Sequence, residues 1–435
     1  MMKRLFCTLV ASMISVAVFG LFASASENDS ADTDEITAAS AITAYCEPGT
    51  YGVSVSSFSI PVNDVSKYLT ITPDDFSIKN AAVTDALWSD ELKVTDVSFK
   101  DGWVLLDVEP FMLSCSRSDY MFWNMNKEPD ENGLQFDFAP GDLEITCTAS
   151  EDLCFSYNDI SEVHTAIIDD FSDEDANGTP YKLFTPQENG EALPLVVWNH
   201  GGGCSEYGRQ IIDDPFATSF ADEHTQKYFP CYVVAPFYAD TNAADTDRSN
   251  IVEAIQALID AGKVDANRVY VTGQSMGSLM SFNYLYENPG FFAAVVGMNG
   301  GPSVNEDGTI VQDDPTWGAA SAAFSHEALQ LIADNGTAVM LVQGIGDPLS
   351  TPDKYAALYN ELKSLNVSEN KLIWHSYTAE QFNYLQDYTI EDTGVPVTDP
   401  ITGATTYVAD AFHGSNRPAA YDTFVKTWLF QQRKS

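Results

Sequence analysis

Six short runs of apolar residues between positions 195 and 374 constrain the fold more than any other feature of the chain. Strands buried on both faces of a sheet read as continuous apolar runs, whereas strands with one wet face alternate. Between two of the runs, Ile251, Ile255 and Leu258 recur at helical spacing. This pattern predicts an α/β domain with a mostly parallel central sheet. The runs are LVVW (195–198), YVVA (232–235), VYVT (269–272), AAVVGM (293–298), VMLV (339–342) and KLIW (371–374).

An earlier part of the chain has a different period. Apolar residues alternate there, as at Phe58 and Ile60, with glycine and proline between the segments. VSFKDGWVLLDV, with Asp-Gly between two apolar runs, predicts a β-hairpin. We therefore expect a small all-β sandwich at residues 45–157 and the α/β domain at residues 158–435.

The first 25 residues have the pattern of a secretory signal sequence. Lys3 and Arg4 precede a long apolar stretch, and Ala23-Ser24-Ala25 fits a cleavage site. Residues 26–44 are polar and acidic, which predicts a linker. We expect a secreted protein with no membrane segment after cleavage.

The formal net charge is −42. A surface this acidic repels phosphate backbones, so we expect no nucleic-acid partner. An exported chain with an even number of cysteines after the signal sequence favours disulfides. We expect Cys147 to pair with Cys154 and Cys204 with Cys231, with buried thiols as the alternative.

Gly273-Gln274-Ser275-Met276-Gly277 fits the motif G-x-S-x-G directly after the VYVT run and before a helical pattern. In this context the motif predicts a sharp strand-to-helix turn that exposes Ser275 as a nucleophile. Upstream, His200 precedes three glycines, whose amides can approach a developing oxyanion. We expect the donors to be the amides of Met276 and of Gly201 or Gly202, with His200 as a structural brace.

A serine nucleophile needs a base and an acid that orients the base. Three histidines follow Ser275, at positions 326, 375 and 413. His413 lies in the polar segment DAFHGSN before the last helical pattern, so it is the expected base, with His375 in reserve. Asp347 follows the VMLV run and is the expected acid, with Asp353 and Asp410 as alternatives.

These motifs resemble the α/β-hydrolase superfamily, and within it secreted carboxylesterases near the feruloyl-esterase and prolyl-oligopeptidase-like groups. Some relatives carry an N-terminal immunoglobulin-like domain, and YGVSVSSFSIPV (51–62) is similar to its first strand. The resemblance thus implies an α/β-hydrolase fold preceded by an immunoglobulin-like sandwich. It rests on YKLFTP (181–186), LPLVVWNHGGG (193–203), CYVVAPFY (231–238), DANRVYVTGQSMGS (265–278), FFAAVVGMNGG (291–301), QGIGDP (343–348) and FHGSNRPAAYDTFVKTWLF (412–430).

The chain departs from this family in several places. Gln343 stands where relatives often have histidine, and Ser278 stands where a second glycine often follows the motif. Segments 302–317 and 381–410 have no clear counterpart, and lie where a lid or an acyl pocket is expected.

A calcium-loop pattern, Asp173 to Gly178, lacks the final carboxylate because Phe184 occupies that position. An Asn-Gly turn explains it better. We therefore expect no metal and no cofactor.

The sequence predicts a secreted serine esterase acting on small-molecule or polysaccharide-linked esters, with Ser275, Asp347 and His413 as its triad. The alternatives are a prolyl-oligopeptidase-like serine peptidase and an inactive protein that binds a glycan or a partner. We also expect the N-terminal domain to mediate self-association or to shield the site.

Overall fold

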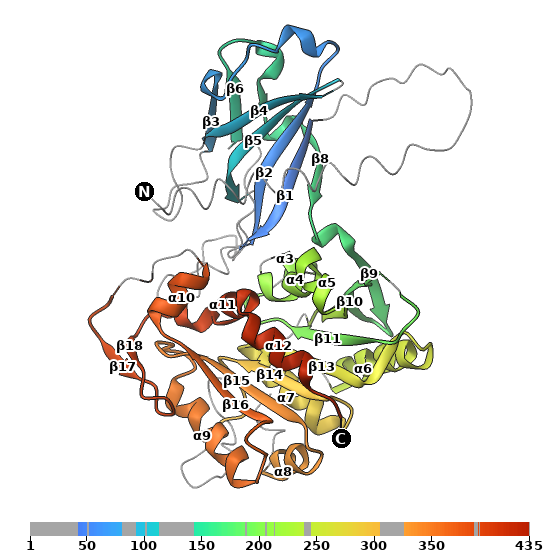
Figure 1. Ribbon diagram of the computed structural model, residues 1–435, viewed down its shortest axis with the longest axis vertical. Coiled ribbons are helices and arrows are strands. Elements are labelled where there is room, and N and C mark those ends of the chain that lie inside the picture. Colours follow the sequence, from blue (N-terminus) through green and yellow to red (C-terminus); the bar gives the residue numbers. More distant parts are fainter. Residues whose placement is uncertain are drawn as a thin grey trace. The chain divides into compact units, whose positions relative to one another are not determined.

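The computed structural model describes residues 42–49, 52–80, 93–100, 102–112, 143–187, 189–204, 207–212, 214–238, 245–304, 326–386, 390 and 392–434. The expected signal sequence, nearly all of the expected linker and Cys115 lie outside these residues. An all-β region reaches Thr165, and an α/β region begins at Phe171 (Figure 1).

Two sheets form the described part of the N-terminal region. The five-stranded sheet has the order β4-β5-β2-β1-β8, and the three-stranded sheet has the order β3-β6-β7. Strands β1 and β8 run parallel, while β1 and β2 run antiparallel. The strands are β1 (Ile42–Gly49), β2 (Gly52–Pro61), β3 (Phe76–Asn80), β4 (Val94–Lys100), β5 (Trp103–Met112), β6 (Leu143–Cys147), β7 (Phe155–Ser156) and β8 (Ile160–Thr165).

The two N-terminal sheets share one apolar core. Phe58 of β2 and Phe155 of β7 meet edge to face with their ring centroids 5.2 Å apart. The expected hairpin is present, because Lys100 of β4 pairs with Trp103 of β5. Strand β8 extends this sheet to Thr165, past the boundary expected at residue 157. The immunoglobulin-like assignment stays a prediction.

The α/β region contains an eight-stranded sheet in the order β16-β15-β14-β13-β11-β12-β10-β9. Neighbouring strands from β16 to β12 run parallel, which confirms the six predicted strands. Strands β10 and β9 are antiparallel additions at one edge. The strands are β9 (Phe171–Ala176), β10 (Thr179–Phe184), β11 (Leu193–Asn199), β12 (Tyr232–Pro236), β13 (Val264–Gln274), β14 (Ala294–Met298), β15 (Ala338–Gly344) and β16 (Leu372–Tyr377).

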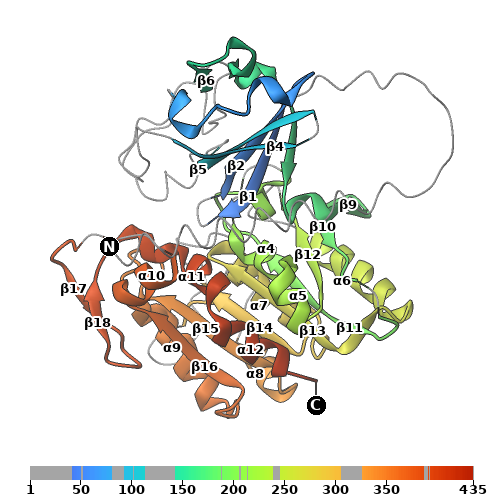
Figure 2. The same cartoon turned by 45° about the horizontal axis from the view of Figure 1, so that its top comes forward.

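Helices cover both faces of this sheet (Figures 1 and 2). Along β11, Val196 and Trp198 belong to one core, and Leu195 and Val197 belong to the other. Both faces of each central strand are therefore dry, which is why the runs are continuously apolar. One face packs against α4 (Pro215–Ala221), α10 (Ala379–Gln386), α11 (Asn416–Tyr421) and α12 (Thr423–Gln431), and the other against α6 (Asp245–Asp260), α7 (Met276–Glu287), α8 (His326–Asp334) and α9 (Pro352–Ser364). The short helices α3 (Arg209–Ile212) and α5 (Glu223–Tyr228) flank α4 in sequence.

The calcium-like sequence forms a tight turn between β9 and β10. Ala176 pairs with Thr179, and the two residues between them have φ angles of 53° (Asn177) and 96° (Gly178). Two positive φ angles identify the Asn-Gly hairpin turn that the sequence predicted.

Neither expected disulfide is present, so that prediction was wrong. Cys204 follows the carboxyl end of β11, whereas Cys231 precedes the amino end of its parallel neighbour β12. The two residues thus lie at opposite ends of this pair of parallel strands. In the N-terminal region, the sulfur of Cys154 accepts a hydrogen bond from the amide of Cys147 instead of forming a covalent bond.

Within the described ranges, no helix has both the length and the apolar content needed to cross a membrane.

Candidate active site

Ser275 occupies a strained turn between β13 and α7. Its φ of 55° and ψ of −120° are rare for a residue other than glycine. A Cβ added to Gly277 would lie 2.0 Å from the carbonyl oxygen of Asn199, and one on Gly273 would lie 2.2 Å from the carbonyl oxygen of Gly277. Packing at the turn therefore requires both glycines of the motif.

The structure brings Ser275, His413 and Asp347 together through two hydrogen bonds. Nε2 of His413 lies 2.9 Å from Oγ of Ser275, and its Nδ1 lies 2.8 Å from Oδ2 of Asp347. Because an ionised carboxylate can only accept, Nδ1 carries the proton and Nε2 accepts from the serine hydroxyl. His413 lies in a 3-10 turn, η7 (Asp410–Gly414).

Asp347 is held in the turn after β15. Its Oδ1 accepts from the amides of Leu349 at 2.8 Å and Ser350 at 3.1 Å. Its Oδ2 accepts from the side chain of Asn299 as well as from His413. The carboxylate is fully removed from water, so these four donors compensate its buried charge.

The other two downstream histidines have different partners. Nε2 of His375, on β16, lies 2.8 Å from Oδ2 of Asp422, whose other oxygen caps α12. His326 is about half exposed at the start of α8, with Nδ1 3.3 Å from Glu361. Each of the two histidines thus interacts with a carboxylate other than Asp347.

The two alternative aspartates take other positions. Asp353 lies in the first turn of α9. Asp410 begins η7, where burial raises its pKa and the negative charge of Asp347 adds to that rise. Asp347 is the aspartate hydrogen-bonded to His413.

The glycines after β11 form a turn braced by His200. The amide of Tyr238 donates to Nε2 of His200 at 3.1 Å. This donor fixes the ring tautomer, so Nδ1–H donates to the carbonyl of Gly201 at 2.8 Å. Complete burial lowers the pKa of His200 to about 4, which keeps the ring neutral at neutral pH. Met276 begins α7, so its amide is among those with no partner inside the helix.

Two carboxamide side chains that sequence reasoning missed hold the turn that carries His413. Nε2 of Gln274 donates to the carbonyl of His413 at 2.7 Å. Nδ2 of Asn299 donates to the carbonyl of Phe412 at 3.0 Å. Gln274 is the variable residue before the serine in the motif, and Asn299 follows the run AAVVGM. Nothing in those positions alone signals such contacts.

The structure accounts for the two departures from the family pattern. The hydroxyl of Ser278 donates to the carbonyl of Gly300 at 2.6 Å, which ties α7 to the turn after β14. Nε2 of Gln343 donates to the carbonyl of Ser350 at 2.9 Å, which closes the loop that holds Asp347. The side chains of both residues thus hold backbone carbonyls near the site in place.

The described part of segment 381–410 packs against the same loop. It contains the end of α10 and a hairpin of β17 (Pro396–Thr398) and β18 (Thr405–Tyr407). The amide of Ala409 donates to the carbonyl of Gly346 at 3.0 Å, and a Cβ on Gly346 would lie 2.2 Å from the carbonyl oxygen of Tyr407. This part supports the loop of Asp347. Most of segment 302–317 lies outside the described residues.

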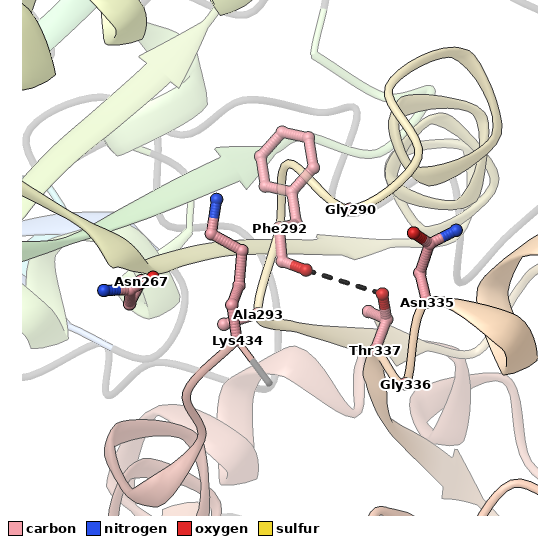
Figure 3. Close-up of a pocket in the computed structure, with 8 residues that line it drawn as sticks. All are labelled: Asn267, Gly290, Phe292, Ala293, Asn335, Gly336, Thr337 and Lys434. Carbon is pink, nitrogen blue, oxygen red and sulfur yellow. Dashed lines mark hydrogen bonds between the residues drawn. The ribbon is translucent and has the colours of Figure 1, made fainter.

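A cavity of 290 Å³ lies where the parallel strands begin, whereas Ser275 lies where they end (Figure 3). Asn267 lines it from the amino-terminal part of β13, Ala293 and Thr337 line it from just before β14 and β15, and Lys434 lines it from near the end of the chain. It is therefore separate from Ser275, which follows the carboxyl end of β13. Among the described residues, no group of three or more His, Cys, Asp or Glu side chains could hold a metal ion.

Comparisons with known proteins agree with this architecture. The prolyl oligopeptidase family matches residues 237–381, a stretch that includes Ser275 and Asp347 but not His413. A thermostable esterase is similar at 19% identity, over 91% of this chain and 100% of that chain, with a TM-score of 0.59. No curated protein sequence matches the chain.

Two further solved structures are less similar. One is a puromycin-hydrolysing peptidase of Mycobacterium tuberculosis, with 17% identity over 54% of this chain and 40% of that chain, and a TM-score of 0.37. The other is Est1E from Butyrivibrio proteoclasticus, with 15% identity over 48% of this chain and 87% of that chain, and a TM-score of 0.33.

The sheet order, the two helical layers and the full-length structural similarity define an α/β-hydrolase fold. The family match and the turn at Ser275 add a narrower conclusion. They support a hydrolase of the serine type within the α/β-hydrolase superfamily.

Proposed function

We propose that this protein is a secreted serine hydrolase that cleaves carboxylic esters through an acyl-enzyme intermediate. The observation that carries the proposal is the series of hydrogen bonds from Ser275 through His413 to Asp347. A serine is a weak nucleophile until an adjacent base accepts its proton, and here the base is already in hydrogen-bond contact. Secretion rests on the signal-like pattern of residues 1–25.

In the proposed reaction, Oγ of Ser275 attacks the ester carbonyl while its proton passes to Nε2 of His413. Asp347 holds the imidazole and stabilises the imidazolium that forms. The protonated His413 then gives its proton to the departing alkoxide as the carbonyl–oxygen bond breaks. Water, deprotonated by His413, attacks the acyl-serine and releases the carboxylic acid together with the free hydroxyl of Ser275.

The oxyanion of the tetrahedral intermediate needs donors fixed in advance. The amide of Met276 at the first turn of α7 is one donor. The other proposed donor is in the glycine turn. The carbonyl of Gly201 accepts a hydrogen bond from His200. In a trans peptide the carbonyl and the N–H of the next residue point in opposite directions. The hydrogen bond from His200 therefore fixes the direction in which the N–H of Gly202 points. We therefore favour Gly202 over Gly201.

A peptidase is the second candidate, because the prolyl oligopeptidase family matches residues 237–381. The same serine, base and acid can cleave amides. The full-length structural similarity is to a protein described as an esterase, which supports ester cleavage for this chain. Small-molecule esters and polysaccharide-linked esters are both suitable classes of substrate.

Hydrolysis of a substrate panel tests the proposal. The panel holds short- and medium-chain nitrophenyl esters, hydroxycinnamate esters and prolyl amides, each with the mature protein and with Ser275→Ala. We expect ester turnover in the wild type and a loss in Ser275→Ala of about 10⁴-fold or more. Ser364→Ala is the control, because Ser364 is an exposed serine at the end of α9.

Faster cleavage of the prolyl amides than of any ester would favour the peptidase. A wild type that cleaves nothing, or a Ser275→Ala variant as active as wild type, would leave a binding protein as the better interpretation.

A further inference from the structure

We propose that Asn299 is a positioning residue that aims Asp347 at His413, an inference that rests on the proposed function. Asn299 follows β14 and is fully buried. Its carboxamide contacts the acid directly and contacts the backbone of the residue before the base. Among the hydrogen bonds of the described residues, its side chain makes none to Ser275. Its effect on the reaction would therefore pass through its neighbours.

The neighbours of Asn299 fix which way its amide points. The amide N–H of Gly344 can only donate, and it faces Oδ1 at 3.4 Å. The carbonyl of Phe412 can only accept, and it faces Nδ2 at 3.0 Å. The hydroxyl of Ser415 also donates to Oδ1. These contacts agree on one orientation, in which Nδ2–H donates to Oδ2 of Asp347.

The backbone at this position also restricts the residue type. Asn299 has a φ of 47°, and its amide donates to the carbonyl of Val342 on β15 at 2.9 Å. Asparagine, aspartate and glycine adopt this conformation with less strain than other residues. A side chain fixed at both its backbone and its amide is well suited to hold a neighbour in place.

Asn299 contacts both the acid, Asp347, and the turn that carries the base, His413. Oδ2 of Asp347 receives both Nδ2 of Asn299 and Nδ1 of His413. The second proton of the same Nδ2 goes to the carbonyl of Phe412. One carboxamide therefore links the acid to the turn that carries the base. The same turn also carries Asp410, whose pKa is raised by burial.

Two substitutions separate positioning from general stability. Asn299→Gly removes the carboxamide and accepts the φ of the site. We expect kcat to fall about 10- to 100-fold with KM little changed, the range found when supporting hydrogen bonds of a site are removed. Asn299→Asp keeps the shape but places a second carboxyl beside Asp347.

The pH profile of Asn299→Asp is the readout that a purely structural role would not move. Two adjacent carboxyls retain a shared proton to higher pH, and a protonated Asp347 holds Nδ1–H of His413 more weakly and does not stabilise the imidazolium. We expect kcat to be low at neutral pH and to recover partly as the pH rises. The matched controls are Asn366→Gly and Asn366→Asp, because Asn366 is exposed and has a φ of 62°.

Labelling of Ser275 by a fluorophosphonate, measured alongside kcat and KM, separates the two possible failures. If wild type reacts and Asn299→Gly reacts equally fast, the positioning role is wrong. It is also wrong if kcat and KM change together with the melting temperature and Asn299→Asp shows no recovery with pH. If wild type itself fails to react, the proposed function is wrong and the positioning role falls with it.

Discussion

The parallel sheet has a carboxyl edge, where its strands end, and an amino edge, where they begin. The same strands build both edges, but the turns differ. At the carboxyl edge, Ser275 and Asn299 adopt positive φ angles, and their polar groups are buried. At the amino edge, the residues at positive φ are glycines, as at Gly262 and Gly290, or the exposed Asn366. Strain at the carboxyl edge is thus carried by two buried polar residues of the candidate site, and the surrounding contacts have to hold it.

Crowding also differs between the two edges. A Cβ on Gly277 would overlap backbone atoms of the turn after β11, whereas a Cβ on Gly262 would meet nothing within 4 Å. The amino edge instead contains a cavity (Figure 3). Gly277 thus lies where two turns of the carboxyl edge pack closely, whereas Gly262 lies in an open turn of the amino edge.

The largest expected effect compares one glycine from each edge. Gly277→Ala places a methyl group against the carbonyl of Asn199, so we expect it to lower the free energy of unfolding by on the order of 3–5 kcal/mol. Gly262→Ala adds only the strain of a positive φ, about 1 kcal/mol. Denaturant unfolding of both variants measures the two values. Equal losses would show that the two edges are equally crowded.

An intermediate effect is expected at His200, which braces the glycine turn. Its pKa is about 4 in the folded protein because of burial, whereas the ordinary value is 6.5. The unfolded chain therefore binds a proton between pH 6.5 and 4 that the folded protein excludes. Stability from this neutral ring is fully present above pH 6.5 and falls as the pH drops, by about 3 kcal/mol in total.

Unfolding of wild type and His200→Gln across that pH range tests this expectation. Glutamine can accept from the amide of Tyr238 but does not titrate, so the wild type should lose stability relative to the variant on acidification. A difference between the two proteins that stays constant from pH 7 to pH 4 would contradict it.

The smallest effect is expected at Lys434, which lines the cavity of the amino edge. Its pKa is lowered by burial, with Asp265 acting in the opposite direction. Lys434→Met keeps most of the side chain and removes the charge. We expect kcat/KM within about twofold of wild type and a change in stability of about 0.5 kcal/mol or less. A tenfold loss of kcat/KM would show that the amino edge takes part in the reaction.

Much of the α/β fold was predictable from local patterns. Continuous apolar runs identified the six parallel strands, and the Asn-Gly pair identified the turn at Asn177. The order of the strands was not predictable from local patterns, because β11 pairs with β13 although β12 lies between them in the sequence. The error over Cys204 and Cys231 has the same origin, since only the parallel pairing of β11 and β12 places them at opposite edges.

The site shows a similar division. Motif and chain order indicated Ser275, Asp347 and His413, which the structure brings into contact. Asn299 could not be found this way, because its partners Asp347 and Phe412 lie 48 and 113 residues further along the chain. Residues that support a site through long-range hydrogen bonds leave no local signature in the sequence.

The parallel pairing of β1 and β8 has a mechanical consequence. Ile42 lies beside Ile160 and Cys46 beside Thr165, so the chain enters this sheet at one end of the strand pair and leaves it at the other. Tension applied to both ends of the region pulls β1 and β8 in opposite directions along their length. All hydrogen bonds of the pair then resist together in shear, and none can open singly from an end. Extension of the chain across this region therefore has to separate β1 from β8 by sliding one strand along the other.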